Sequence, residues 1–422
     1  MRGGETPPSI LSLKMIKKDQ IKTKKPKDYW NKRAAIFAIV SIIITWIIGY
    51  AINNEAPPDC KMVLPSADFC KPLDNDSFEG VIQNEDRTET IVGWASLNEA
   101  PGYAGPVKVM VGIDPAGTVL GTYVTSNSET PNYYERIENE KFLEEFIGLP
   151  VISPFKIGEE IEAVTRATVT SNAIAEAVRT ASYTIAETQL GLEVETIIEP
   201  IKFGAPEIAI LGLYLVGYIG HRGNFKYKKQ VRWLSLIIGM VYLGFIFNIP
   251  VTVANFTSLL LGYFPNWRTN LYWFFLMGGI LFVSTVDNKN PYCQWFCPFG
   301  AAQECLGAIG GARLWSPGKS IRRNLEWIQR GLAFGAIILG LLMRNPGFSS
   351  FEIFGNLFSF TGSWPQWVIL VIVLLLSLFI KRPWCNYLCP IDPIMDLVLA
   401  SHRWIKQEFR KIWQLKNLKK NS

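Results

Sequence analysis

Six long apolar runs constrain the fold of this chain more than any other feature of its sequence. They lie at 34–52, 203–220, 232–249, 271–286, 327–343 and 367–380. A bilayer core of roughly 30 Å takes about 20 helical residues to cross, and the runs are long enough, or nearly so. Charged residues make up only 18% of the 422 residues, too few for an ordinary soluble enzyme of this length. We therefore expect a polytopic α-helical membrane protein with six transmembrane helices.

Lys and Arg near the run ends predict the orientation of the chain. Residues 1–33 hold ten of them, whereas the loops 250–268 and 345–366 together hold only Arg268. Basic loops stay on the cytoplasmic side of a membrane, so both termini are expected in the cytoplasm of a multi-pass cell-membrane protein. The run 34–52 is too long for a removed signal peptide and is expected to remain as an anchor.

The segment 53–200 then faces outward. It has 25 acidic and 9 basic residues, a net charge of 9 − 25 = −16, although the whole chain carries +6. Strands are expected at 107–114 and 118–126 around a Gly-containing turn, and helical stretches at 134–147 and 172–189. Together they predict an extracytoplasmic α/β domain.

Two features of this outer segment leave alternatives open. Cys60 and Cys70 either form a disulfide, which an oxidising compartment permits, or remain free thiols. Thr170, Ser171 or Asn172 could each cap the helix that follows the stretch 160-EIEAVTRATVTSNA-173.

That stretch contains more hydroxyl groups than a helix cap needs. Its Glu162-Ala-Val-Thr165-Arg166-Ala167-Thr168 segment resembles the flavinylation motif of FMN-binding domains in sodium-pumping and Rnf-type complexes. The resemblance implies that Thr168 carries FMN through a phosphoester bond. Arg166 stands where the motif has Gly, and it could add a phosphate contact; Thr165, Ala167 and Thr170 complete the expected FMN site.

A second resemblance lies upstream, in residues 93–133. Its Gly-Tyr-x-Gly-Pro and Glu129-Thr130-Pro131 signatures are similar to those of NosR/NirI-type membrane flavoproteins, which adds Glu129 and Thr130 to the expected FMN-binding residues. The compact form, without a ferredoxin domain after Cys389, looks most like the RdhC/PceC type encoded beside reductive dehalogenases. A flavin transferase is the maturation partner that this resemblance implies.

The third informative feature is an internal repeat. The stretch 291-PYCQWFCPF-299 returns as 383-PWCNYLCPI-391, each time at the end of an apolar run. Positions i and i+4 share one face of a helix, so Cys293/Cys297 and Cys385/Cys389 could together bind iron or an iron–sulfur centre. Zinc, a disulfide and buried free thiols are the alternatives. Cys305 is expected to be a packing residue.

The expected organisation is a sequence of five parts. They are a basic cytoplasmic segment at 1–33, an anchor at 34–52, an FMN domain at 53–200, a five-helix membrane domain at 203–400 and a basic amphipathic tail at 401–422.

The resemblance implies a membrane flavoprotein that passes electrons from menaquinol, through FMN, to an extracytoplasmic terminal reductase such as a reductive dehalogenase. Quinol oxidation would be its enzymatic activity, and no nucleic-acid partner is expected. The alternative is a redox-sensing regulator of the NosR/NirI type. FMN and the cysteines are expected on opposite sides of the membrane, a separation of roughly 30 Å that a quinone, a moving domain or a partner would have to bridge.

Overall fold

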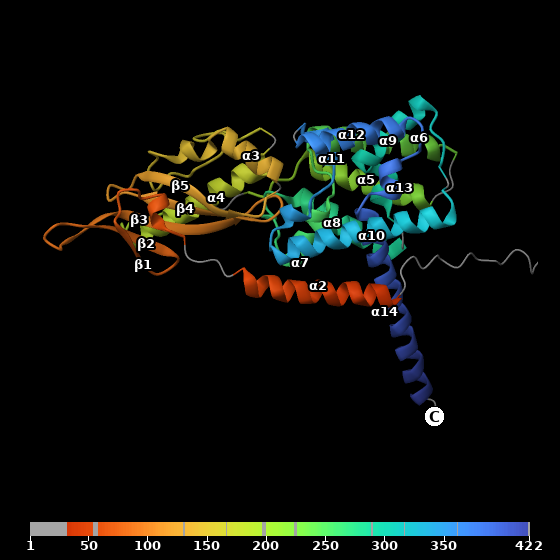
Figure 1. Cartoon of the computed structure of the whole chain (residues 1–422), viewed down its shortest axis with the longest axis horizontal. Helices are drawn as coiled ribbons and strands as arrows, with labels where there is room; N and C mark the ends of the chain where they lie inside the picture. The colour runs from red at the N-terminus through yellow and green to blue at the C-terminus, as the bar shows by residue number, and fades with distance from the viewer. Residues whose placement is uncertain are drawn as a thin grey trace, which may run out of the picture.

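The computed structural model contains a sheet domain joined end to end with a helical bundle (Figure 1). It describes residues 32–53, 58–129, 131–165, 167–195, 200–222, 226–287, 290–315, 317–360 and 362–420. The amino-terminal helix α2 (Lys32–Ile52) runs alongside the bundle and packs against helix α10 (Lys319–Leu342).

The sheet domain is built on five antiparallel strands in chain order. They are β1 (Phe69–Pro72), β2 (Ser77–Gln83), β3 (Glu89–Pro101), β4 (Pro106–Ile113) and β5 (Val119–Asn127). Helix α4 (Thr168–Thr188) covers one face, because its alanines at four-residue spacing let the helix approach the β-branched side chains of β4. Those alanines are Ala173, Ala177 and Ala181, each almost fully buried.

The expected hairpin is confirmed as β4 and β5. The turn between them includes Gly117, whose φ of +82° is one that residues with a side chain rarely adopt. Cys60, in the short 3-10 helix η1 (Cys60–Met62), forms a disulfide with Cys70 on β1.

Two helix predictions in this domain are wrong in their bounds. Helix α4 begins at Thr168, four residues before the expected start at 172, so Asn172 lies inside it and donates to the Thr168 carbonyl at 2.7 Å. The stretch 134–147 is two elements, α3 (Pro131–Asn139) and the 3-10 helix η2 (Phe142–Phe146), because Lys141 between them takes a left-handed φ of +53°.

The bundle contains a helix for each of the five remaining apolar runs. The first half comprises α5 (Ala205–Arg222), α6 (Lys228–Ile238), the π-helix η3 (Gly239–Ile246), α7 (Val253–Leu261), α8 (Leu271–Asp287), the π-helix η4 (Tyr292–Phe296) and α9 (Pro298–Gly310). The second comprises α10, the 3-10 helix η5 (Pro346–Ser349), α11 (Phe354–Ser359), α12 (Trp364–Ser377), α13 (Pro383–Tyr387) and α14 (Ile391–Lys420). The expected boundary between membrane domain and tail, at 400/401, falls inside α14.

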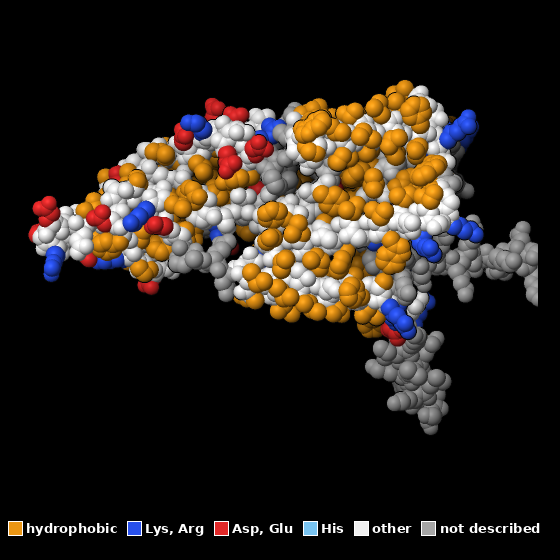
Figure 2. Space-filling view, in the orientation of Figure 1, with side chains coloured by type: hydrophobic (Ala, Val, Ile, Leu, Met, Phe, Trp, Pro, Cys, Tyr) orange, Lys and Arg blue, Asp and Glu red, His pale blue; other side chains and the backbone are white. Residues whose placement is uncertain are grey.

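Three helices in the described part of the chain are long and apolar enough to cross a membrane. They are α2, the continuous α6–η3 helix from Lys228 to Ile246, and α10. The apolar parts of α5, α8 and α12 are shorter, at 10–17 residues. In Figure 2, hydrophobic side chains cover the bundle and α2, while charged side chains gather on the sheet domain and at the opposite end of the bundle.

The sheet domain contacts the bundle through backbone-directed hydrogen bonds. The Asn345 side chain donates to the Asn127 carbonyl at 2.9 Å, and Arg136 Nη2 donates to the Ser359 carbonyl at 3.2 Å. Ser258 Oγ on α7 donates to the Ala104 carbonyl. These bonds join the sheet domain to α7, to α11 and to the loop after α10.

Candidate cofactor sites

The start of α4 presents its hydroxyl groups in two directions. Thr170 and Ser171 are buried, and Ser171 Oγ donates to the Ala167 carbonyl at 3.1 Å while accepting from the Val164 amide at 3.2 Å. Thr165 and Thr168 are exposed. Ala167 occupies the N-cap position and has no side-chain group to cap the first turn. The amide groups there are therefore available to an anion such as a phosphate.

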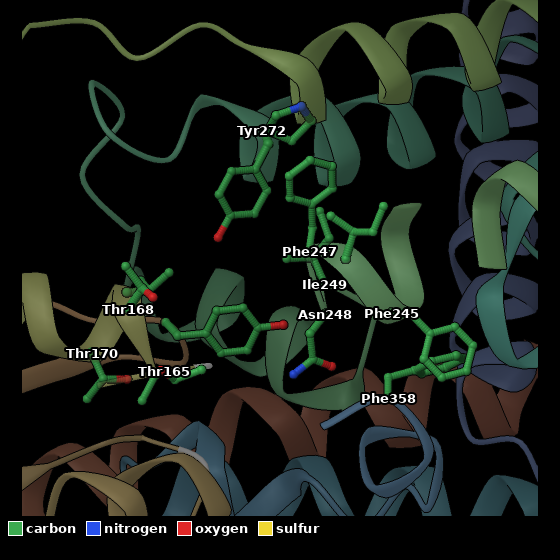
Figure 3. Close-up of a pocket in the computed structure, with 14 residues that line it drawn as sticks. Thr165, Thr168, Thr170, Phe245, Phe247, Asn248, Ile249, Tyr272 and Phe358 are labelled. Atoms are coloured by element: carbon green, nitrogen blue, oxygen red, sulfur yellow. The ribbon is translucent and has the colours of Figure 1, made fainter. Parts of the chain in front are cut away.

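Thr168 opens into a cavity between the sheet domain and the bundle. The cavity has a volume of about 500 Å³, large enough for a cofactor. Thr165 and Thr168 lie on one side of it, and Phe247, Asn248, Ile249 and Tyr272 from the bundle lie on the facing side (Figure 3). Its mainly aromatic and apolar bundle wall suits a planar ring system, and we call it the Thr168 cavity.

The structure separates the other predicted FMN contacts from one another. Ala167 and Thr170 line the Thr168 cavity with Thr165 and Thr168. Glu129 does not line it: this buried carboxylate accepts from the Tyr103 amide at 2.7 Å and so fixes the loop at 102–105. A Cβ on Gly102 would lie 1.9 Å from Glu129 Oε1, which explains the glycine. Thr130 and Arg166 lie outside the described residues.

The two cysteine pairs meet in a second cavity. Cys293, Cys297, Cys385 and Cys389 all line a space of about 210 Å³ within the bundle, here called the four-cysteine cavity. Cys305 does not line it; it is half-buried on α9, in keeping with a packing role.

The expectation that each pair shares the face of one helix is wrong. Cys293 lies in η4, whereas Cys297 has an extended ψ of 121° and stands at the N-cap of α9. Cys385 lies in α13, and Cys389 follows the end of that short helix. The cause is the Pro after each second cysteine, because a residue before Pro is driven out of the helical region. The chain therefore turns at each pair and encloses the thiols from two sides.

Two buried donors in the four-cysteine cavity have no hydrogen-bond partner among the described residues. They are Nη2 of Arg382 and Nε1 of Trp384. Buried N–H groups are costly to leave unpaired, and the sulfides of an iron–sulfur cluster are acceptors for such donors. The cavity therefore fits an anionic cluster.

In the described chain, the thiols are spaced more widely than a single tetrahedral zinc ion requires. Within the described chain, no three of the four Sγ atoms lie within 4.8 Å of one another. A tetrahedral zinc site with Zn–S bonds of about 2.3 Å would bring its sulfurs to about 3.8 Å.

Arg382 is held in this cavity from two sides. Its Nη1 donates to the Cys293 carbonyl at 2.7 Å, and its Nε lies 2.8 Å from Glu304 Oε1. Arg232 binds the same carboxylate with both terminal nitrogens, at 2.9 and 2.7 Å. Burial alone would raise the pKa of Glu304, but the bonds from Arg232 and the charge of Arg382 outweigh it and lower that pKa. The sequence patterns did not single out Arg382 and Trp384, although they lie within three residues of Cys385.

The linings of the two cavities meet at neighbouring residues. Asn248 and Ile249 line the Thr168 cavity, and the next residues, Pro250 and Val251, line the four-cysteine cavity. On α11, Phe358 lines the first and Phe354 the second, one helical turn or about 6 Å apart. The loop after η3 and the short helix α11 are therefore the partition between them.

Comparison with known proteins assigns a cofactor to each cavity. Residues 102–182 match the FMN-binding domain model, and residues 269–317 and 364–411 each match the 4Fe-4S binding domain model. The first match contains the Thr168 segment, and the other two contain one cysteine pair each. The chain thus combines an FMN-binding domain with a duplicated 4Fe-4S binding domain. FMN and an iron–sulfur centre are its cofactors.

Relatives of known type share parts of this arrangement. Protein NirI of Paracoccus denitrificans is 29% identical over 44% of this chain and 29% of its own length. Regulatory protein NosR of Pseudomonas aeruginosa is 24% identical over 43% of this chain and 27% of its own. A component of the ion-translocating oxidoreductase complex of Vibrio vulnificus is 37% identical over 18% of this chain and 41% of its own.

These similarities support a relationship to the NosR/NirI type. The matched regions span less than a third of NirI and of NosR. With the apolar helices of the bundle, they indicate a membrane protein that binds FMN and an iron–sulfur centre.

Proposed function

We propose that this chain transfers electrons within the membrane, between an iron–sulfur centre held by Cys293, Cys297, Cys385 and Cys389 and FMN bound covalently to Thr168. The observation that carries the proposal is that the linings of the two cavities meet, at 248–251 and on α11. An iron–sulfur centre exchanges single electrons and a flavin exchanges one or two, so adjacent sites for the two form an electron-transfer pair.

The attachment of FMN to Thr168 is supported by geometry. Thr168 is exposed in the cavity at the uncapped start of α4. Its hydroxyl can carry a phosphoester while the first amide groups of the helix bind the phosphate oxygens. The facing Phe247 and Tyr272 enclose the ring system from the bundle side. A flavin transferase would install the bond.

The proposed direction of transfer rests on a proposed topology. We place the acidic sheet domain on the outer face, both termini in the cytoplasm and six helices across the membrane, in keeping with the Lys/Arg distribution. Menaquinol is the proposed donor and an extracytoplasmic terminal reductase the acceptor, with a reductive dehalogenase suggested by the RdhC/PceC resemblance. Quinol oxidation would be the activity of the chain itself.

The proposal is tested with the full chain, loaded with both cofactors, in liposomes. A naphthohydroquinone is added as donor, and a membrane-impermeant ferric acceptor is supplied outside. Carrier function predicts reduction of the outer acceptor that depends on the chain and is lost in a chain without FMN. Equal reduction with and without FMN would refute the proposal.

A regulatory function is the second candidate, because the matched NosR protein is named as regulatory. In that case FMN would be reduced in the liposomes without reduction of the outer acceptor. Deletion of the gene would then change transcription and leave the reductase, once formed, as active as before.

A further inference from the structure

A third cavity lies directly beyond the four-cysteine cavity. It has a volume of about 410 Å³ and lies between α10, α13 and the start of α14. Cys385, Asn386 and Asp392 line both cavities, so the third adjoins the four-cysteine cavity. We call it the α10–α13 cavity.

The lining of this cavity combines acceptors, donors and aromatic rings. Glu326 and Asp396 add carboxylates, and Arg322 and Arg330 add guanidinium groups. Trp315 and Tyr387 pack edge to face with ring centroids 5.2 Å apart, and the Tyr387 hydroxyl donates to the Trp315 carbonyl at 2.8 Å. Such a site has acceptors for hydroxyl groups and flat surfaces for a ring.

The edge of the cavity is apolar and exposed. Leu314 and Trp315 precede α10 and are 69% and 44% exposed. On α10, Ile321, Leu325 and Ile328 follow helical spacing on one face, and Ile321 and Ile328 are 53% and 51% exposed. This strip offers a path for a hydrocarbon tail beside a polar head-group site.

We propose that the α10–α13 cavity binds the head group of a lipid-soluble hydroquinone and that Asp396 accepts a hydroxyl proton from it. The proposal rests on the electron-transfer function above and gives it an entry site. A cavity of this volume holds a small head group, not a protein, and the exposed apolar strip selects a donor with a lipid tail.

The chemistry balances with FMN as the final acceptor in the chain. Oxidation of the hydroquinone to the quinone releases two electrons and two hydroxyl protons. The electrons leave one at a time through the four-cysteine cavity, and the protons pass to Asp396 and solvent. FMN takes up two electrons and two protons on its own side. Burial raises the pKa of Asp396, against the opposing charges of Arg330 and Arg403, which favours proton acceptance.

The site is located first by labelling, without any electron transfer. The full-length protein in liposomes is irradiated with an azido-naphthoquinone, and the labelled peptides are identified by mass spectrometry. Label is expected within 314–330 and 385–396. Leu325→Trp, which fills the cavity, should abolish this label, and Leu332→Trp, two turns further along α10 and exposed, should keep it. Label concentrated around Phe247 and Tyr272 instead would overturn the proposal.

Electron entry is then measured as bleaching of FMN absorbance. Asp396→Asn should slow bleaching by a naphthohydroquinone about 100-fold and leave bleaching by dithionite unchanged. Glu408→Gln, three turns away on α14, is the matched control. An unchanged rate in Asp396→Asn would refute its role. If protein reduced with dithionite does not reduce the outer acceptor, the proposed function is refuted. The photolabelling result would still show whether the α10–α13 cavity binds the quinone.

Discussion

At the scale of single residues, neighbouring groups of the same type have different surroundings. Of the hydroxyl-bearing residues at the start of α4, Thr170 and Ser171 are buried, whereas Thr165 and Thr168 are exposed. Only Thr168 lies in the first turn of α4 and is also exposed. Exposure and helix position therefore both agree with Thr168, the attachment residue that the motif resemblance implies.

Thr168→Val tests this assignment with almost no change in volume. We expect loss of the flavin fluorescence that survives denaturation in a gel, because the phosphoester has no oxygen to form on. Thr165→Val should keep it. The chain should still insert in both variants, and peptide mass spectrometry should find FMN on Thr168 in the wild type. Fluorescence that persists in Thr168→Val would move the attachment elsewhere.

Glu304→Gln tests the ion network beside the cysteines. Removing the charge between Arg232 and Arg382 should lower the free energy of unfolding by about 3 kcal/mol, since a partly buried arginine loses its counter-ion. The folded pKa of Glu304 is lowered, so this contribution is complete at neutral pH and is lost as the pH falls through that lowered value.

The measurement is thermal unfolding in detergent as a function of pH. The wild type should exceed Glu304→Gln by a constant margin around neutrality, and the margin should vanish in acid. Glu144→Gln breaks only the exposed pair with Lys141 and should cost less than about 1 kcal/mol. A margin that grows in acid would contradict the assigned role.

At the scale of elements, broken helices create the sites. The α6–η3 helix ends before Pro250, the cysteine pairs end two short helices, and α11 is a single short helix between two loops. Sequence patterns predicted the hairpin of β4 and β5, the apolar helices and the repeated cysteine pairs of the bundle. Each of these features has a local period or repeat. The patterns did not predict β1 to β3, whose residues alternate irregularly, or α11, whose position depends on packing against η3.

Gly239→Ala tests whether the α6–η3 helix supports the cysteine turn. A Cβ at Gly239 would lie 2.4 Å from the Phe296 carbonyl oxygen, next to Cys297, so one backbone must move. Overpacking of this kind costs about 1–3 kcal/mol, and we expect less bound iron and a lower unfolding temperature. Gly335→Ala on α10 meets no atom within 4 Å and should be neutral or stabilising by up to about 1 kcal/mol. Equal iron content in both variants would contradict the prediction.

At the scale of the whole molecule, three cavities follow one another through the bundle toward the sheet domain. The α10–α13 cavity shares Cys385 with the four-cysteine cavity, which shares α11 and the loop 248–251 with the Thr168 cavity. The Lys/Arg pattern predicts FMN and the cysteines on opposite faces of the membrane, and hydropathy does not show where a helix breaks inside the bundle. In the folded chain the linings of the two cavities meet at 249/250 and on α11.

The proposed orientation is tested by cysteines placed at each end. Glu159→Cys on the sheet domain should react with a membrane-impermeant thiol reagent on intact cells. Gln407→Cys on α14 should react only after permeabilisation; both positions are exposed, so access depends on the membrane alone. Labelling of Gln407→Cys on intact cells would place α14 outside the cell and contradict the proposed orientation.

The most direct test of electron transfer between the two cofactors is rapid-mixing spectroscopy on the double variant Cys385→Ser/Cys389→Ser. This variant lacks the thiols on one side of the four-cysteine cavity and keeps Thr168 unchanged. The wild type and the control Cys305→Ser should show bleaching of FMN absorbance after mixing with a naphthohydroquinone. The double variant should retain covalent FMN, lose its iron and show no bleaching by the hydroquinone. Bleaching in the double variant at the wild-type rate would contradict electron transfer from the iron–sulfur centre to FMN.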